Sequence, residues 1–219
     1  MRAVLLLAIA SVLAGALARS EPQERIVDRI AVTVGKQIIT QNDLIRDVRV
    51  SAFLDRKPLE LTPEARRAAA SRLIDQILIL REAADSHLTL ANPEDADKLL
   101  AQVKLQYPAE QAYRAALEEY RIRESDVSAH LLDGLRALRF TELRFRPQVQ
   151  ISDGELKAYY DKLADTWRKA GRESIPTFDQ SREQAESLLL EERVSAALDE
   201  WLEMERATTP IEYHQAAFE

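Results

Sequence analysis

The three histidines, His87, His130 and His214, are the first side chains to consider for chemistry in this chain of 219 residues. A zinc or catalytic site normally places such ligands a few positions apart on one helix or loop. Here the three fall in different elements, where surface or capping roles are the default. The chain contains no cysteine, so no thiolate could serve as ligand or nucleophile. We therefore expect neither a metal site nor a bound cofactor.

Carboxylates are plentiful, among them Asp153, Glu155 and Asp161. At helix starts and on solvated faces, such residues are explained by capping and by the helix dipole. Nothing in the spacing selects one pair for acid–base catalysis. The sequence also lacks a G-x-S-x-G nucleophile motif and a glycine-rich phosphate loop. We therefore expect a protein without enzymatic activity of its own.

The aromatic residues are more suggestive. Tyr107, Tyr113 and Tyr120 lie in or around one short predicted helix. Tyrosine combines a large apolar ring with one polar end, which suits wet binding surfaces. Two interpretations remain open: these rings pack between helices, or they form a surface that binds apolar polypeptide. Under the second interpretation, the candidate peptide-binding residues are Phe53, Tyr107, Tyr113 and Tyr120.

Helix-start signals predict the elements that would position these side chains. Thr40 with Asp43, and Ser152 with Glu155, match the capping box. Proline after a capping residue, as at Thr62-Pro63 and Asn92-Pro93, is a further start signal, and Pro58 and Pro147 are expected to stop helices. The predicted helices cover about 41–56, 63–86, 93–106, 109–120, 125–145, 152–170 and 178–206.

The second of these helices is the most apolar. Leu73, Ile77 and Leu80 recur at helical spacing and predict a stripe that faces the core. Further apolar residues imply burial on more than one face: Ile74, Leu78 and Ile79.

The β signals are confined to the two ends of the chain. Ile26–Val34, a Gly35-Lys36 turn and Gln37–Thr40 predict a two-stranded ribbon. A lone ribbon is marginally stable in water, so it must pair or pack with another element. A short strand is predicted behind Pro210, over Ile211 to His214.

The beginning of the sequence has the pattern of a secretory signal peptide. Arg2 precedes an apolar run over 3–17, and a small-residue signature predicts cleavage between Ala18 and Arg19. The apolar run is shorter than a membrane span needs, so we expect an exported product rather than an anchored one. With 30 basic and 37 acidic residues, the chain does not have the charge of a general nucleic-acid binder.

Three blocks of sequence resemble the SurA-like periplasmic chaperones of outer-membrane proteins. The first is VDRIAVTVGKQIITQNDL at Val27–Leu44, and the second is RLIDQILI at Arg72–Ile79. The third begins with FDQSREQ at Phe178, continues with LDEWL at Leu198 and ends with IEY at Ile211. The order and spacing of the blocks carry the resemblance, which covers most of the chain after residue 18.

The resemblance implies a mostly α fold: a multi-helix chaperone core whose small β-sheet joins the N-terminal ribbon to the C-terminal strand. It divides residues 19–219 into an N-terminal helical domain (26–146), a connector (147–177) and a C-terminal helix and strand (178–214). In this family, one or two parvulin-type prolyl isomerase domains precede the C-terminal helix. The short connector leaves no room for such a domain, which needs roughly a hundred residues.

The function expected from this resemblance is that of a non-catalytic periplasmic chaperone or assembly factor in a Gram-negative cell. Its partners would be unfolded outer-membrane polypeptides, without nucleic acid, metal or stable membrane insertion. Two alternatives stay open: a peptidyl-prolyl isomerase by family relationship, and a dedicated structural partner of one envelope protein. A compact apolar patch would favour the fixed partner, and a long lined cleft would favour the chaperone.

Overall fold

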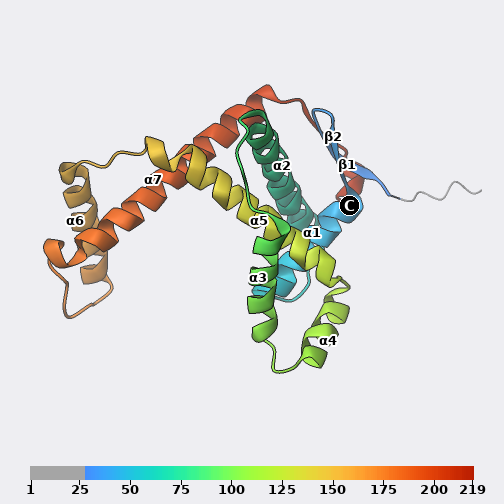
Figure 1. Ribbon diagram of the computed structural model, residues 1–219, viewed down its shortest axis with the longest axis horizontal. Coiled ribbons are helices and arrows are strands. Elements are labelled where there is room, and N and C mark those ends of the chain that lie inside the picture. Colours follow the sequence, from blue (N-terminus) through green and yellow to red (C-terminus); the bar gives the residue numbers. More distant parts are fainter. Residues whose placement is uncertain (1–27) are drawn as a thin grey trace, which may run out of the picture.

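The computed structural model describes residues 28–219 and shows a mostly helical protein with one small sheet, as expected (Figure 1). The predicted signal peptide, its cleavage site at Ala18 and Arg19, and the first two residues of the predicted ribbon lie outside the described residues. The elements are β1 (Ile30–Val34), β2 (Gln37–Thr40), α1 (Gln41–Asp55), α2 (Pro63–Asp85), α3 (Pro93–Leu105), α4 (Glu110–Tyr120), α5 (Glu124–Arg144), α6 (Asp153–Lys169), α7 (Phe178–Thr208) and β3 (Ile211–Tyr213), with short 3-10 turns at Arg146–Gln148 and Gln215–Ala217.

The capping boxes form as the sequence predicts. The hydroxyl of Thr40 accepts a bond from the amide of Asp43, and the Asp43 carboxylate accepts one from the amide of Thr40. Helix α1 ends within one residue of the expectation. It stops at Asp55 because Arg56 adopts a left-handed conformation with φ of 54°, ahead of the proline at position 58. At the other end of the chain, α7 continues past the predicted end to Thr208.

The sheet has the order β2-β1-β3, with both pairs antiparallel. Gly35 has φ of 58°, which fits the first position of a tight two-residue hairpin turn. Strand β1 begins at Ile30, later than predicted, because the Asp28 carboxylate accepts bonds from the amides of Arg29 and Asn42. The backbone bond from the amide of Gln41 to the carbonyl of Arg29 lies beside this cap.

The main core joins the two ends of the chain. Val32 of β1, Ile74 of α2 and Trp201 of α7 lie in one cluster of buried side chains, together with Phe218 near the C-terminus. The rings of Phe140 and Trp201 have centroids 5.1 Å apart and connect α5 to α7. The pairing of β3 with β1 closes this core across almost the whole described chain.

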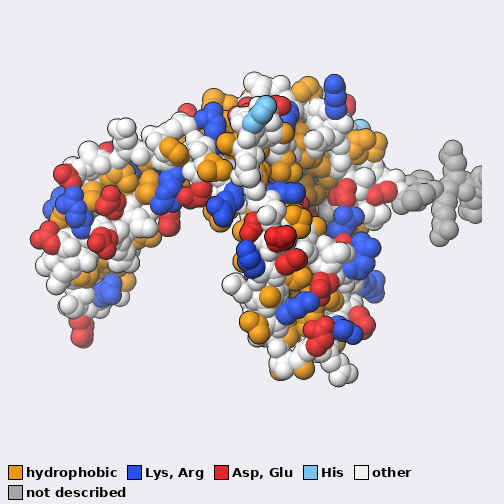
Figure 2. Space-filling model, in the orientation of Figure 1, with side chains coloured by type: hydrophobic (Ala, Val, Ile, Leu, Met, Phe, Trp, Pro, Cys, Tyr) orange, Lys and Arg blue, Asp and Glu red, His pale blue; other side chains and the backbone are white. Residues whose placement is uncertain are grey.

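Two smaller clusters extend from the core. Helix α3 packs against α5, and α4 packs against α1, so that these helices form one lobe around a shared cluster. Helix α6 packs against the first half of α7 as an arm. The arm and the lobe point away from the core in different directions, and the surface is hollowed between them (Figure 2). Between β2 and β3, residues 41–210 contain no strand.

The predicted stripe on α2 is only partly correct. The fully buried residues are Ile74, Leu78 and Ile79, which pack in the same cluster as the sheet and α7. The residues expected to face the core are half-buried: two of them, Leu73 and Ile77, do pack against the core cluster, and all three also line an open space between α2, α1, α5 and β2. These residues are Leu73, Ile77 and Leu80. No helix within residues 28–219 is long and apolar enough to cross a membrane.

Candidate functional site

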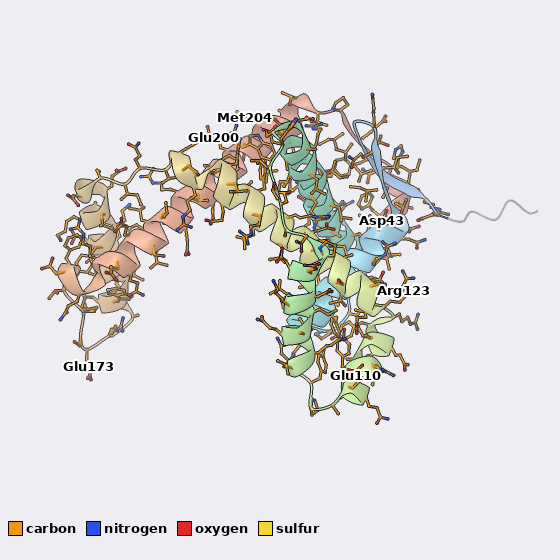
Figure 3. The ribbon with its side chains drawn as sticks, in the orientation of Figure 1. Asp43, Glu110, Arg123, Glu173, Glu200 and Met204 are labelled. Carbon is orange, nitrogen blue, oxygen red and sulfur yellow. The ribbon has the colours of Figure 1, made fainter. Side chains whose placement is uncertain are left out.

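A cavity of about 340 Å³ opens between β2 and the helices α1, α2 and α5. We call this space the cleft. Asp43, at its α1 wall, lies on the same side of the molecule as Arg123, which precedes α5 (Figure 3). The lining residues are Gln37, Ile38, Ile39, Asp43, Arg46, Asp47, Val50, Leu73, Gln76, Ile77, Leu80, Asp126, Ala129, His130 and Asp133.

Apolar side chains from two directions form part of this lining. Leu73, Ile77 and Leu80 come from consecutive turns of α2, since residues three or four apart share one helix face. Ile38 comes from β2 and is 53% exposed. A ligand with apolar side chains could therefore displace water from both walls.

The polar centre of the cleft is Asp47. Its side chain is only 4% exposed. One carboxylate oxygen lies 2.5 Å from Nη2 of Arg72, and the other lies 3.4 Å from Nδ1 of His130. A buried carboxylate needs such partners, because an unpaired charge in the interior is strongly unfavourable. Asp47 is therefore fixed in position, with its charge compensated from outside the cleft by Arg72.

Two further aspartates on α5 line the cleft in different electrostatic states. Burial tends to raise the pKa of Asp126, but the hydrogen bonds that it accepts from Arg123 outweigh burial, and the pKa lies below its usual value. For Asp133, burial is the stronger effect and raises the pKa, despite the ion pair of 3.3 Å with Arg136. The carboxylate of Asp133 is therefore the less compensated of the two.

The lining offers apolar and charged contacts to a ligand. The Asp47–His130 pair could orient a proton, but no serine, threonine, cysteine, lysine or tyrosine is among the described residues that line the cleft. A hydroxyl or thiol nucleophile activated by the histidine would have to lie within its hydrogen-bonding reach. Among residues 28–219, no cluster of three or more potential metal ligands is found.

The four predicted peptide-binding residues come together, but outside the cleft. The ring of Phe53 stacks on Tyr107 with centroids 5.9 Å apart, and it meets Tyr113 and Tyr120 edge-on. Phe53 and Tyr113 are each 1% exposed, so they form the interior of the α1–α3–α4 lobe. Only Tyr107 and Tyr120 keep part of their surface open, and the hydroxyl of Tyr120 donates to the carbonyl of Lys57.

Burial in this lobe has an electrostatic consequence for Tyr113. Burial, with a smaller contribution from the nearby Glu124, raises the pKa of its hydroxyl far above the usual value. The ring is thus held neutral and inaccessible. Whether the open edges of Tyr107 and Tyr120 contact a client stays a prediction.

The cleft residues were missed from sequence for two reasons. His130 was assigned a surface or capping role, whereas it is half-buried beside Asp47. The apolar excess on α2 was interpreted as core, whereas one stripe of it lines an opening. One signal was present: Asp47 interrupts an otherwise apolar α1 face that includes Leu44, Val48 and Val50.

A scan against models of known protein families finds no match, and a search of curated proteins finds none either.

Proposed function

We propose that this protein binds extended segments of unfolded polypeptides in the cleft and holds them without catalysis, as a chaperone or assembly factor of the SurA-like kind. The single observation that carries the proposal is an open cleft whose lining combines apolar side chains with fixed carboxylates, and whose described residues include no hydroxyl, thiol or amine side chain. We propose exported proteins of a Gram-negative periplasm as its clients, with outer-membrane polypeptides foremost.

The size and lining of the cleft suit transient holding. Its volume lies near the lower end of the roughly 300–1,000 Å³ that is usual for ligand pockets, so it takes a few side chains at a time. Each apolar side chain that leaves water contributes on the order of 1.5–3 kcal/mol before ordering costs are subtracted. A few such contacts give weak, reversible binding, which a chaperone needs in order to release its client.

The connector supports a function without isomerase activity. Residues 149–177 contain α6 and the loops on either side of it, and no strand. Helix α6 packs against α7 through Leu156, Tyr160 and Ala164, so this segment completes the arm. An isomerase domain inserted at this point would need a far longer chain.

The test is suppression of aggregation. An unfolded outer-membrane β-barrel is diluted from urea, and light scattering is followed with and without a molar excess of residues 19–219. We expect scattering to fall in proportion to the amount of protein. The variant Ile77→Gln, in the cleft, should be clearly weaker than the wild type. Leu138→Gln, at a 57% exposed position of α5 that does not line the cleft, is the matched control and should equal the wild type.

Two results would overturn the proposal. If the wild type at tenfold excess does not suppress aggregation, the protein is not a chaperone for this client. If the Ile77→Gln variant suppresses aggregation as well as the wild type does, the cleft is not the binding site. Acceleration of proline isomerisation in a peptide assay would instead favour the isomerase alternative. A pull-down that returns one envelope protein in fixed proportion would favour the dedicated structural partner.

A further inference from the structure

The outer edge of β2 is open toward the cleft. In the sheet order β2-β1-β3, β2 has a partner on one side only. Three of its four residues, Gln37, Ile38 and Ile39, line the cleft, whereas no residue of β1 or β3 does. The cleft therefore lies on the unpaired side of the sheet. Unpaired strand edges are ready templates for another extended chain.

Two hydrogen bonds determine which backbone groups face that edge. The amide of Gln41 donates to the carbonyl of Arg29, on the β1 side, at 2.8 Å. The amide of Thr40 donates to the Asp43 carboxylate at 2.9 Å, so it points away from β1. Because backbone groups alternate between the two edges of a strand, the amide and carbonyl of Ile38 point the same way as the amide of Thr40.

The backbone groups of Ile38 are thus available at this edge. No side chain or loop in residues 28–219 makes a hydrogen bond to either of them. The capping carboxylate of Asp43 occupies the next outward amide, at Thr40, so pairing along β2 would be centred on Ile38. A strand added here would lie about 4.8 Å from β2, on the side where the cleft opens.

The charges of the cleft specify what such a strand should carry. Four aspartates line the cleft against a single arginine, Arg46. Arg46 pairs with Asp43 at 3.2 Å and lies 3.9 Å from Asp126. The other arginines that pair with these aspartates are not part of the lining, so the lining keeps an excess of carboxylates: they are Arg72, Arg123 and Arg136. A lysine or arginine on an incoming chain would therefore meet carboxylates first, while its apolar neighbours would meet Leu73 and Ile77.

We propose that a client segment binds by adding a fourth strand to the open edge of β2, and that the face it turns into the cleft alternates apolar with basic side chains. This inference rests on the proposed function and deepens it. Main-chain bonds at Ile38 give affinity that does not depend on client sequence, and the cleft supplies the preference for apolar and basic residues. Such a division fits a protein that must accept many β-rich clients.

The probe is a fluorescent nine-residue peptide in which valine and lysine share one face and threonine occupies the other (TVTKTVTKT). Binding to the mature protein is followed by fluorescence anisotropy. A counterpart with glutamate in place of lysine should bind at least about tenfold more weakly, as should a counterpart N-methylated along its backbone. If the N-methylated peptide binds within twofold of the parent, strand addition is wrong.

Binding of the same peptide is also measured with the Ile38→Pro variant of the protein. Proline removes the outward amide but no bond to β1, and edge strands tolerate it at such positions. The matched control is Ile38→Val, which keeps the amide, the β-branched shape and most of the apolar surface. We expect about tenfold weaker binding for the proline variant and wild-type binding for the valine variant. If the proline variant is not folded by circular dichroism, the N-methylated peptide decides alone.

The outcomes separate this inference from the proposed function. Aggregation suppressed equally by wild type and a folded Ile38→Pro variant would overturn strand addition alone. No suppression by the wild type would overturn the proposed function itself. If sedimentation shows a wild-type dimer that the proline variant dissociates, the occupant of the edge is a second copy of the chain, and the client proposal is wrong.

Discussion

Arg206 of α7 donates a hydrogen bond of 2.9 Å from Nε to Asp75 of α2, and its Nη2 also reaches Ser71. This pair connects the last helix to the most apolar one, beside the core cluster that joins the chain ends. Both side chains are 28% exposed, so the pair is shielded from much of the solvent. Burial raises the pKa of Asp75, and Arg206 only partly offsets that effect.

Replacing Arg206 should therefore destabilise the protein in a pH-dependent way. We expect Arg206→Met to lower the free energy of unfolding by about 2 kcal/mol at pH 7, because it leaves a half-buried carboxylate without its partner. The raised folded pKa means that Asp75 binds its proton more tightly in the folded state. The penalty in the variant should shrink as the pH falls through that pKa and Asp75 becomes neutral. Urea unfolding of the variant and the wild type at pH 7 and pH 4 measures this difference in free energy of unfolding. A difference that grows on acidification would contradict the role given to the Arg206–Asp75 pair.

Removing the C-terminal strand should destabilise the whole molecule. Truncation after Arg206 removes the β1–β3 pairing and the buried side chains of Ala217 and Phe218. The point variant Phe218→Ala isolates one part of this loss and should cost about 3 kcal/mol by itself. Thermal unfolding followed by circular dichroism compares both with the wild type. A truncated chain that melts at the wild-type temperature would show that the ends do not close the fold.

The aromatic cluster gives a prediction that separates structure from binding. Because Phe53 is buried among three tyrosines, Phe53→Leu should lower the free energy of unfolding by about 1 to 2 kcal/mol. The folded variant should nevertheless bind the peptide probe as the wild type does. Tyr107→Ala, at the partly open edge, is the companion variant. If a fully folded Phe53→Leu protein lost probe binding, the binding site would be this aromatic cluster and not the cleft.

The arm should be sensitive to its N-terminal cap and to acid. The hydroxyl and the amide of Ser152 both donate to Glu155, and these bonds hold the pKa of Glu155 below its usual value. The stabilisation that these capping bonds give to α6 is therefore present above the ordinary pKa of glutamate. It is lost as the pH falls through the lower pKa that Glu155 has in the folded protein. We expect Ser152→Ala to increase amide hydrogen exchange in α6 about fivefold at neutral pH.

Exchange in α7 after Arg193 is the internal control for that variant, because the capping box caps α6 and Glu155 reaches α7 at Arg193. The difference between the Ser152→Ala variant and the wild type should narrow in acid. An unchanged α6, or a difference that widens below pH 4, would contradict the role given to the cap.

The sequence predicted the helices and the sheet better than it predicted the site. Capping residues such as Thr40 and Ser152 act within one turn, so their effect can be read locally, and the helices begin where they indicate. The pairing of Ile211–Tyr213 with β1 was expected from the family resemblance, because nothing local encodes a contact across the whole chain.

The cleft could not be predicted in the same way. Ile77 and Leu78 are both apolar neighbours on α2, so the sequence does not distinguish them. The placement of α5 and β2 decides which of the two is fully buried. The four aromatic rings of the predicted binding surface do lie together, but their spacing in the sequence could not show that Phe53 and Tyr113 are enclosed. Local signals predict elements, whereas an opening between elements is a property of their packing.

The most direct test of a polypeptide-binding cleft is site-specific photo-crosslinking to an unfolded client. A benzoylphenylalanine is placed at Ile38, which is 53% exposed inside the cleft, or at Leu138, which is 57% exposed outside it. With an unfolded outer-membrane barrel present, we predict strong crosslinks from position 38 and only background from position 138. Equal crosslinking from both positions, or crosslinks from position 138 alone, would contradict the account.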